Sequence, residues 1–396
     1  MHKTNAVASF RKRAGLSQEV LAQRLNLSRP ALAALEAGKR NLKAEELYRL
    51  SEIFGVPMAS LMKAERPQLD FAPLYRLFTE EAGGRVAEAE CEYGGAALAA
   101  RPILGKFQRW VERWVEVLEL AEEEPPKLPA VPEVTLGQAV PARALADWVR
   151  YECGLSSTAP IHNLRAVAES GLNVFVFLSH EHGSPLSGAS WNSSAAGACV
   201  LIRHGMREHM RFTLAHEIAH LFAHPGQAHG SGKALPHDAI RSQETYANQF
   251  AAELLMPADG VRKMVGGESE LESHRTIQRL AWYFQVSFQA IAIRLESMRF
   301  LKRGWYDHEL ERMKADGRLP QVPVNEEDLQ LRPAASDCGR SEPQPALFKY
   351  YATMLLDEGD ISLGKFCQLM GKDWDLDRAD RYLHRFRIAQ VSGEQE

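Results

Sequence analysis

Residues 213–220 contain the pattern His-Glu-x-x-His inside an apolar frame. His216 and His220 are four positions apart, so on a helix of 3.6 residues per turn both imidazoles project from one face. Two imidazoles at this spacing can hold one zinc ion. Glu217 lies beside them, where its carboxylate can accept a proton from a water molecule that the metal activates. The pattern therefore predicts the centre of a zinc-dependent peptidase.

A catalytic zinc ion takes three protein ligands and keeps one position open for water. Glu244, near the start of a helix predicted over about 242–256, would complete a His₂Glu set. Asn248 follows one turn later and could accept a ring N–H from a ligating histidine. Glu253 is the alternative ligand, but it is nine residues from Glu244 and points to nearly the opposite face. Only one of the two carboxylates can serve, and we favour Glu244.

Histidine is dense around this pattern, with seven between His204 and His237. His224 is one further turn from His220 and could face the site. The simpler alternative for the central pair is two histidines on a half-buried helix with no metal between them. The sequence also leaves open which group stabilises the oxyanion of a peptidase reaction. The candidates are Tyr246, His224, His229 and His237.

The elements that position these residues follow from hydrophobic periodicity. Apolar, β-branched residues over 172–178 predict a strand, and shorter strands are expected near 188–191 and 199–203. The metal-ligand helix follows, and a His/Gly-rich loop over 225–237 separates it from the helix at 242–256. Further helices are expected at 141–153, 162–170 and 269–300. Trp110 and Trp114, spaced i and i+4, predict a core-facing stripe on another helix.

Composition limits the classes of protein that fit. A chain of 396 residues with 45% hydrophobic residues has enough apolar sequence for two or three domains. No apolar run approaches the length of about 18 residues that spans a membrane, and the first residues lack the apolar core of a signal peptide. The five cysteines are scattered, odd in number and without a Cys-x-x-Cys pair. Reduced thiols, a cytoplasmic location and no membrane partner are therefore expected.

The net charge of −4 is unevenly distributed. Residues 1–64 contain eleven Lys and Arg against five Glu and no Asp, which is a balance of +6, so the rest of the chain carries −10. A small basic module attached to an acidic body indicates that the module binds a polyanion.

The chain divides into five predicted parts. Residues 5–64 read as a compact bundle of about five short helices, and the four prolines and acidic run near 122–132 mark the clearest linker. The predicted parts are a bundle at 5–64, a helical connecting region at 65–121, a Pro/Glu-rich linker at 122–135, a catalytic domain at 136–300, and a second linker with a small helical C-terminal region at 301–396.

Two stretches identify a family resemblance for the catalytic domain. Residues 211–221, with the metal-ligand pattern, and residues 244–257, with Glu244, Asn248 and the end Leu-Leu-Met-Pro, resemble the ImmA/IrrE metallopeptidases. Ser187-Gly188-Ala189-Ser190 and residues 284–295 agree with this resemblance, which spans about 140–300. It implies a gluzincin-like site with His216, His220 and Glu244 as zinc ligands and Glu217 as base. One departure is His204, where an asparagine is expected.

Residues 9–62 resemble the Xre/Cro-type helix-turn-helix. Ser17 and Gln18 begin one helix, and Ser28 and Arg29 begin the next, which would enter the major groove of double-stranded DNA. Lys39 and Arg40 follow and would reach the phosphate backbone. The base-reading face is poor, since only Arg29 can contact guanine in bidentate fashion. We therefore expect modest specificity, or binding only as a homodimer. A bundle used for protein contact alone is the alternative.

The resemblances together imply a multidomain protein. An all-α helix-turn-helix domain is followed by an α+β zincin-like (gluzincin-type) metallopeptidase domain and a helical C-terminal region. The implied activity is a Zn²⁺-dependent endopeptidase, with Mn²⁺ as an alternative ion. The implied protein substrate is a helix-turn-helix repressor, cleaved in a stress, phage or mobile-element response. Two other hypotheses stay open: a transcription regulator whose peptidase-like domain senses a ligand or partner without cleaving, and an antitoxin-like or defence factor.

Overall fold

The structure, a computed structural model, divides the chain into two units, Met1–Asp70 and Phe71–Glu396, and each is described separately. It describes these parts of the chain: residues 7, 11, 16–36, 40 and 42–54 of the first unit, and 74–77, 95–132, 141–180, 186–223, 237–266, 271–315, 343–371 and 374–393 of the second.

The first unit is helical. Its described helices are α2 (Gln18–Arg24), α3 (Arg29–Glu36) and α4 (Ala44–Phe54). The hydroxyl of Ser17 accepts a hydrogen bond from the Val20 amide, and the hydroxyl of Ser28 accepts one from the Ala31 amide, so both serines cap the helices that follow them, as predicted. These helices enclose a small apolar core, whose fully buried members are Val7, Leu21, Ala22, Leu25, Leu32, Leu35 and Leu50.

The second unit is built on a four-stranded mixed sheet with the order β1-β3-β4-β2. Its strands are β1 (Leu74–Leu77), β2 (Val174–Ser179), β3 (Leu186–Ser193) and β4 (Gly197–Arg203). The β3–β4 pair is an antiparallel hairpin, β2 pairs with β4 in parallel, and β1 pairs antiparallel with β3. The three strands predicted from the sequence are thereby confirmed.

Both faces of the sheet are covered, as the alternation of side chains along β2 shows. Phe175 and Phe177 point to one face and contact the long helix α6 (Gly95–Leu120), where Trp114 and Trp110 lie 4.7 and 5.9 Å from them between ring centroids. This confirms the predicted tryptophan stripe. The alternate residues Val174, Val176 and Leu178 point to the opposite face and join the main core.

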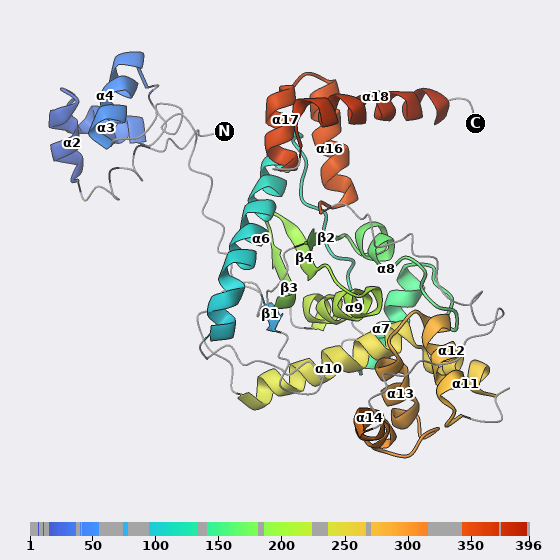
Figure 1. The fold of residues 1–396 in the computed structure, drawn as a ribbon. Coiled ribbons are helices and arrows are strands. Elements are labelled where there is room, and N and C mark those ends of the chain that lie inside the picture. The colour runs from blue at the N-terminus through green and yellow to red at the C-terminus, as the bar shows by residue number, and fades with distance from the viewer. Residues whose placement is uncertain are drawn as a thin grey trace. The chain divides into compact units, whose positions relative to one another are not determined.

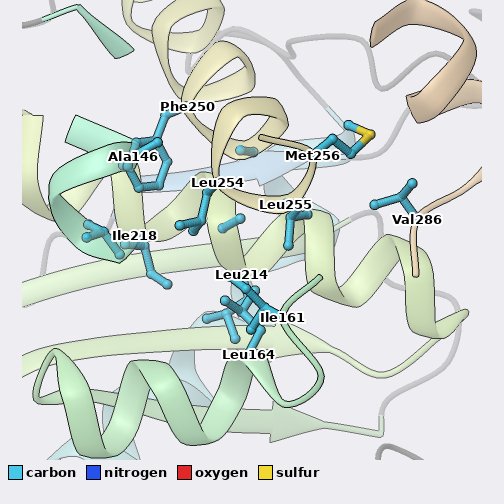
Figure 2. Packing of buried hydrophobic residues seen from close by; sticks show 14 of the residues in the cluster. Ala146, Ile161, Leu164, Leu214, Ile218, Phe250, Leu254, Leu255, Met256 and Val286 are labelled. Atoms are coloured by element: carbon cyan, nitrogen blue, oxygen red, sulfur yellow. The ribbon is translucent and has the colours of Figure 1, made fainter. Parts of the chain in front are cut away.

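Three helices build that opposite layer (Figure 1). The helix α9 (Arg207–Ala223) packs on β3 and β4, α10 (His237–Leu255) packs along α9, and α7 (Ala142–Glu152) packs on α10. Figure 2 shows buried apolar side chains of the interior that they enclose. Labelled members of this core include Leu214, Ile218, Phe250, Leu254 and Leu255.

The remaining helices surround this layered body. After α10 come α11 (Ala258–Val265), α12 (His274–Phe284), α13 (Phe288–Ser297) and α14 (Trp305–Ala315). The C-terminal helices are α16 (Ala346–Asp357), α17 (Leu363–Met370) and α18 (Leu376–Gly393). Several contacts join this C-terminal group to α6. The rings of Phe348 and Tyr351 pack near Trp114, and Lys365 forms an ion pair with Glu116 at 2.6 Å.

Four features differ from the sequence-based expectations. The strand β1 falls in a region predicted as mostly helical, because a four-residue strand has no recognisable period without its partner β3. The predicted helix at 162–170 is a short α8 (Leu164–Ala166) followed by a π-helical turn, η2 (Val167–Gly171). The helix α10 begins at His237, inside the predicted loop, because its polar first turns carry no hydrophobic period. The helix α11 was not predicted.

The Pro/Glu-rich stretch, predicted to be a linker, is packed against the second unit over its described residues. Leu128 and Val131 are partly buried against the main core. Asn173 donates a side-chain hydrogen bond to the Lys127 carbonyl at 2.8 Å. The described part of this stretch, up to residue 132, is therefore packed on the second unit.

Candidate metal centre and nucleic-acid interface

The helix α9 is buried on nearly all sides, which places its polar side chains in the interior. His216 and Glu217 are at most 1% exposed, and His220 is 5% exposed. A helix that is apolar around its circumference belongs inside a domain. Buried ionisable groups are costly unless a partner compensates them. These three side chains therefore need a partner with charge or hydrogen-bonding capacity.

The structure brings the three predicted ligands together. The Nε2 atoms of His216 and His220 lie 3.0 Å apart. The two carboxylate oxygens of Glu244, from α10, lie 3.0 Å from Nε2 of His216 and 3.1 Å from Nε2 of His220. Ligands held about 2.0–2.1 Å from a tetrahedral zinc ion are separated by about 3.3 Å. Among the described residues, this is the one group of three such side chains that could hold a metal ion.

Asn248 determines how His216 presents its ring. Its Oδ1 lies 3.1 Å from Nδ1 of His216. Because this oxygen only accepts hydrogen bonds, Nδ1 carries the proton, and in the neutral ring Nε2 presents a lone pair. That lone pair faces the second imidazole and the carboxylate of Glu244. Two nitrogen donors and one carboxylate oxygen in this arrangement suit a divalent cation such as zinc, so the residues fit the implied metal.

The electrostatics of Glu244 agree with this fit. Burial raises the pKa of this carboxyl, but the imidazoles of His216 and His220, when they are protonated and no metal is bound, outweigh burial and hold the pKa well below its usual range. The carboxylate is therefore ionised at neutral pH, as a metal ligand must be.

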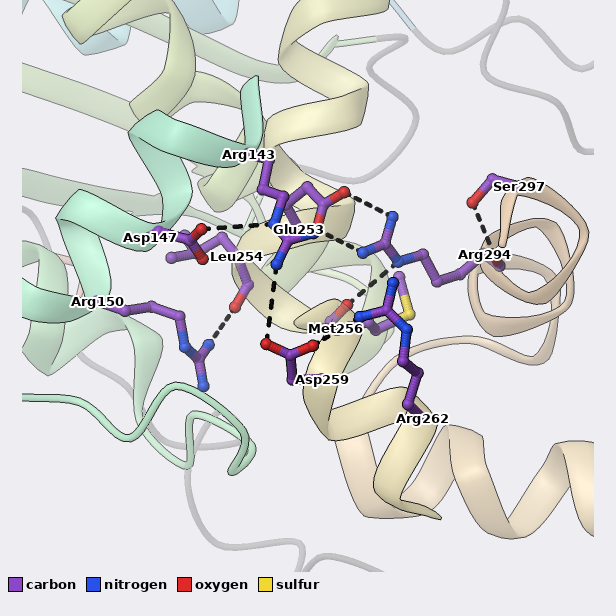
Figure 3. Close-up of polar contacts among 10 residues, drawn as sticks. All are labelled: Arg143, Asp147, Arg150, Glu253, Leu254, Met256, Asp259, Arg262, Arg294 and Ser297. Carbon is purple, nitrogen blue, oxygen red and sulfur yellow. Dashed lines mark hydrogen bonds and ion pairs between the residues drawn. The ribbon is translucent and has the colours of Figure 1, made fainter. Parts of the chain in front are cut away.

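The alternative ligand, Glu253, has another partner (Figure 3). Its carboxylate forms a two-pronged ion pair with Arg294 of α13, with N–O distances of 2.8 and 2.5 Å. Arg294 also donates to the Met256 carbonyl at 3.2 Å, so the pair ties the end of α10 to α13. Glu253 is thereby committed to a structural role, which leaves Glu244 as the carboxylate beside the histidines.

The strand β3 passes very close to Glu217. A Cβ atom built on Gly188 would lie 2.6 Å from Cγ2 of Thr213 and 2.9 Å from Oε1 of Glu217. Only glycine allows this approach without displacing one of the two side chains. The stretch Ser187–Ser190, which the sequence indicated only through the family resemblance, thus borders the carboxylate predicted to act as base. The sequence offered no spacing signal for this role.

Of the four candidates for the oxyanion-stabilising group, Tyr246 is the one whose side chain the structure describes, and it faces away from the metal ligands. Tyr246 is half-buried, which raises its pKa, but it follows Glu244 by two residues and projects about 200° further around α10. It lines a separate hollow on that helix, with Arg241 and Thr245. His224 and His229 lie outside the described residues, as does the side chain of His237. The ring of His204 lies against that of His180 in a tilted arrangement, with ring centroids 4.6 Å apart.

The first unit uses some of its predicted DNA contacts internally. Gln18 donates to Glu36 at 2.8 Å, and Arg40 forms an ion pair with Glu46 at 2.6 Å. Burial raises the pKa of Glu46. The hydrogen bonds from Arg40 and from the Lys43 amide, with the positive charge of both residues, lower it by more, so the net shift is downward. Arg29 is exposed at the start of α3, in position to contact a ligand. Lys39 lies outside the described residues.

Glu36 is the residue in this unit that sequence reasoning missed. Its buried carboxylate accepts hydrogen bonds from Nε of Arg11 at 2.6 Å and from Gln18. The three residues come from separate segments, so no local pattern indicated the cluster. It holds the start of α2 against the end of α3, and this sets the angle between the two helices that a helix-turn-helix presents to DNA.

Comparison with known protein families supports both halves of this description. Residues 7–61 match the helix-turn-helix family, and residues 172–296 match the IrrE N-terminal-like domain. The two matches confirm the resemblances drawn from the sequence, in the predicted order along the chain. No curated protein matches the chain. None of the helices in the described part of the chain has the length and hydrophobicity needed to cross a bilayer.

Proposed function

Because a helix-turn-helix domain precedes an IrrE-like domain in this chain, we propose that the protein is a DNA-binding regulatory zinc metallopeptidase with a zincin-like, gluzincin-type catalytic domain. The observation that carries the proposal is the convergence of His216, His220 and Glu244 within hydrogen-bonding distance of one another, beside the buried Glu217. The donor set favours Zn²⁺, and Mn²⁺ is the alternative. The proposed substrate is a helix-turn-helix repressor or a related protein.

Each side chain has a defined task in peptide-bond hydrolysis. A metal ion held by the two imidazoles and the Glu244 carboxylate supplies Lewis-acid polarisation of the scissile carbonyl and acidifies water. Glu217 accepts a proton from the attacking water as its oxygen bonds to the carbonyl carbon. The same carboxyl then passes that proton to the amine nitrogen as the C–N bond breaks. Asn248 keeps the ring of His216 oriented throughout.

The helix-turn-helix unit would hold the peptidase on DNA near its substrate. A peptidase tethered to DNA meets a repressor bound at a neighbouring site at a raised effective concentration. Arg29 supplies the strongest base-reading contact, and Ser17 and Ser28 place the first amides of α2 and α3 for phosphate binding.

The test uses the purified full chain, loaded with Zn²⁺ or Mn²⁺, and helix-turn-helix repressors from the same genome. Wild type and Glu217→Gln are compared by following intact substrate and new peptide termini with mass spectrometry. We expect defined cleavage by the wild type alone. Equal loss of substrate with both proteins would contradict the peptidase mechanism. Binding of a repressor without cleavage by either protein would favour a sensor domain instead.

A further inference from the structure

The strand β1 comes from a part of the chain far from the rest of the sheet. Leu74–Leu77 precede β3 by more than 100 residues, yet they form its antiparallel neighbour at the outer end of the sheet. The opposite side of β3 pairs with β4. Without β1, the main-chain groups on this side of β3 would form an open edge, which another extended chain can pair with.

That edge belongs to a strand that borders the candidate base. Arg76 pairs with Gly188, and Gly188 is the residue whose Cβ position would lie 2.9 Å from Oε1 of Glu217. Neighbouring strands are separated by about 4.8 Å. An extended peptide in the place of β1 would therefore run one strand spacing from the backbone that borders Glu217.

We propose that β1 is an internal competitor for the substrate. It occupies the edge of β3 at which an extended segment of the substrate docks, and it must leave before cleavage. The proposal rests on the proposed peptidase function, since a docking edge beside Glu217 has a purpose only if a peptide bond is cut there. Main-chain hydrogen bonds hold a peptide in this way with little dependence on its sequence.

Two features make β1 suited to displacement. Its pairing spans four residues, and the register shifts between Arg76 and Leu77, so few ladder bonds hold it in place. Pro73 precedes it directly and has no amide to extend the ladder.

The test opens the edge by changing one backbone group. Arg76→Pro removes an amide and imposes a restricted φ angle, whereas the matched control Arg76→Ala removes the same side chain and keeps the amide. Both are made in the full-length chain with Glu217→Gln, so that no cleavage interferes. The probe is a fluorescent synthetic peptide with the sequence of residues 71–79. We expect its Kd to fall at least tenfold in Arg76→Pro relative to Arg76→Ala. Equal Kd values in folded proteins would overturn the proposal.

Hydrogen exchange on the wild type provides a second measurement that does not depend on whether the proline variant folds. Successive amides of β3 point alternately toward β1 and toward β4. We expect the amides facing β1 to exchange at least tenfold faster than those facing β4, through local opening. Equal rates would show that β1 does not leave on its own, and would overturn the proposal.

The repressor assay separates this proposal from the proposed function. With Glu217 intact, Arg76→Pro should cleave at least fivefold faster than Arg76→Ala. If no variant cleaves any repressor, the peptidase function is wrong, and peptide binding together with hydrogen exchange still decides whether β1 covers a docking edge. If the wild type cleaves and Arg76→Pro is no faster than Arg76→Ala, the competitor proposal alone is wrong.

Discussion

The helices α9 and α3 bear the residues of the two candidate functions, and they differ in whether those residues are buried or exposed. In α9 the three candidate catalytic side chains, His216, Glu217 and His220, are at most 5% exposed. Neighbours such as Asn248, which contacts His216, hold them in place. In α3 the apolar Leu32 and Leu35 are buried, while Arg29 faces solvent. Hydrolysis needs fixed groups in a low-dielectric site, because desolvated charges act most strongly there. DNA reading needs side chains that reach out to base edges. Five substitutions test this contrast.

The largest effect is expected at Glu217. Glu217→Gln keeps the size of the side chain but cannot accept the proton from water. We expect the rate of repressor cleavage to fall by about 10²–10⁴, which is the contribution typical of a general base. Metal content, measured by elemental mass spectrometry, should be unchanged. A variant that cleaves at the wild-type rate would remove Glu217 from the mechanism.

The close approach of β3 is the second target. Gly188→Ala forces Thr213 or Glu217 to move, because the added methyl group would lie 2.6 Å from the Thr213 side chain. We expect cleavage to drop about 10²-fold, as small displacements of catalytic groups do, with a loss of about 1–3 kcal/mol in stability from overpacking. Gly205→Ala is the matched control, since no atom lies within 4 Å of its added Cβ. If both variants behaved alike in activity and thermal melting, the steric argument would fail.

Asn248 should affect metal affinity rather than the fold. Asn248→Ala removes the acceptor for the His216 ring N–H, and we expect zinc to bind about 10–100-fold more weakly, as for other groups that orient a ligand. Competition with a chromogenic chelator measures this change. Asn248→Asp keeps an acceptor at the same place and should restore most of the affinity. Unchanged affinity in the alanine variant would show that the hydrogen bond does not orient the ring.

In the exposed half of the comparison, Arg29→Ala should weaken DNA binding about tenfold, within the range of about 1–3 kcal/mol for a bidentate base contact. Fluorescence anisotropy with a fragment from the protein's own promoter, at fixed salt, measures it. Arg49→Ala provides a control, because Arg49 lies on α4 and pairs with Glu45 at 2.9 Å. Equal losses in both variants would indicate a general charge effect instead of recognition.

The smallest effect concerns the Arg40–Glu46 pair. Glu46→Gln should destabilise the first unit by about 1 kcal/mol at neutral pH, because the buried carboxylate accepts charge-assisted hydrogen bonds from a partly exposed arginine. The pKa of Glu46 is lowered in the folded unit, so its contribution is present above the ordinary value of 4.5 and is lost as pH falls below it. Denaturant unfolding of both proteins between pH 7 and 3 measures this. A difference between them that does not shrink toward low pH would contradict the role of the ionised carboxylate.

Much of the candidate site could be predicted because its signals are local. The histidine spacing on α9, the strands β2 to β4 and the serine caps of α2 and α3 depend on residues a few positions apart, and the helical and strand periods translate such spacings into faces. The DNA contacts were less predictable. Gln18 and Arg40 have the residue type and the position expected of DNA contacts. In the structure, however, Gln18 donates to Glu36 and Arg40 pairs with Glu46, so both are engaged within the unit.

The amino-acid sequence determined the pair of imidazoles, the neighbouring carboxylate and the order of the two domains, since covalent spacing on a regular helix is enough to align them. Tertiary structure was needed to choose between Glu244 and Glu253, because that choice depends on Arg294, which lies 41 positions further along the chain from Glu253. It was also needed to place β1 on the edge of β3 and to bring Gly188 against Glu217. Such contacts join segments separated by many residues, and no local period records which distant partner a segment will meet.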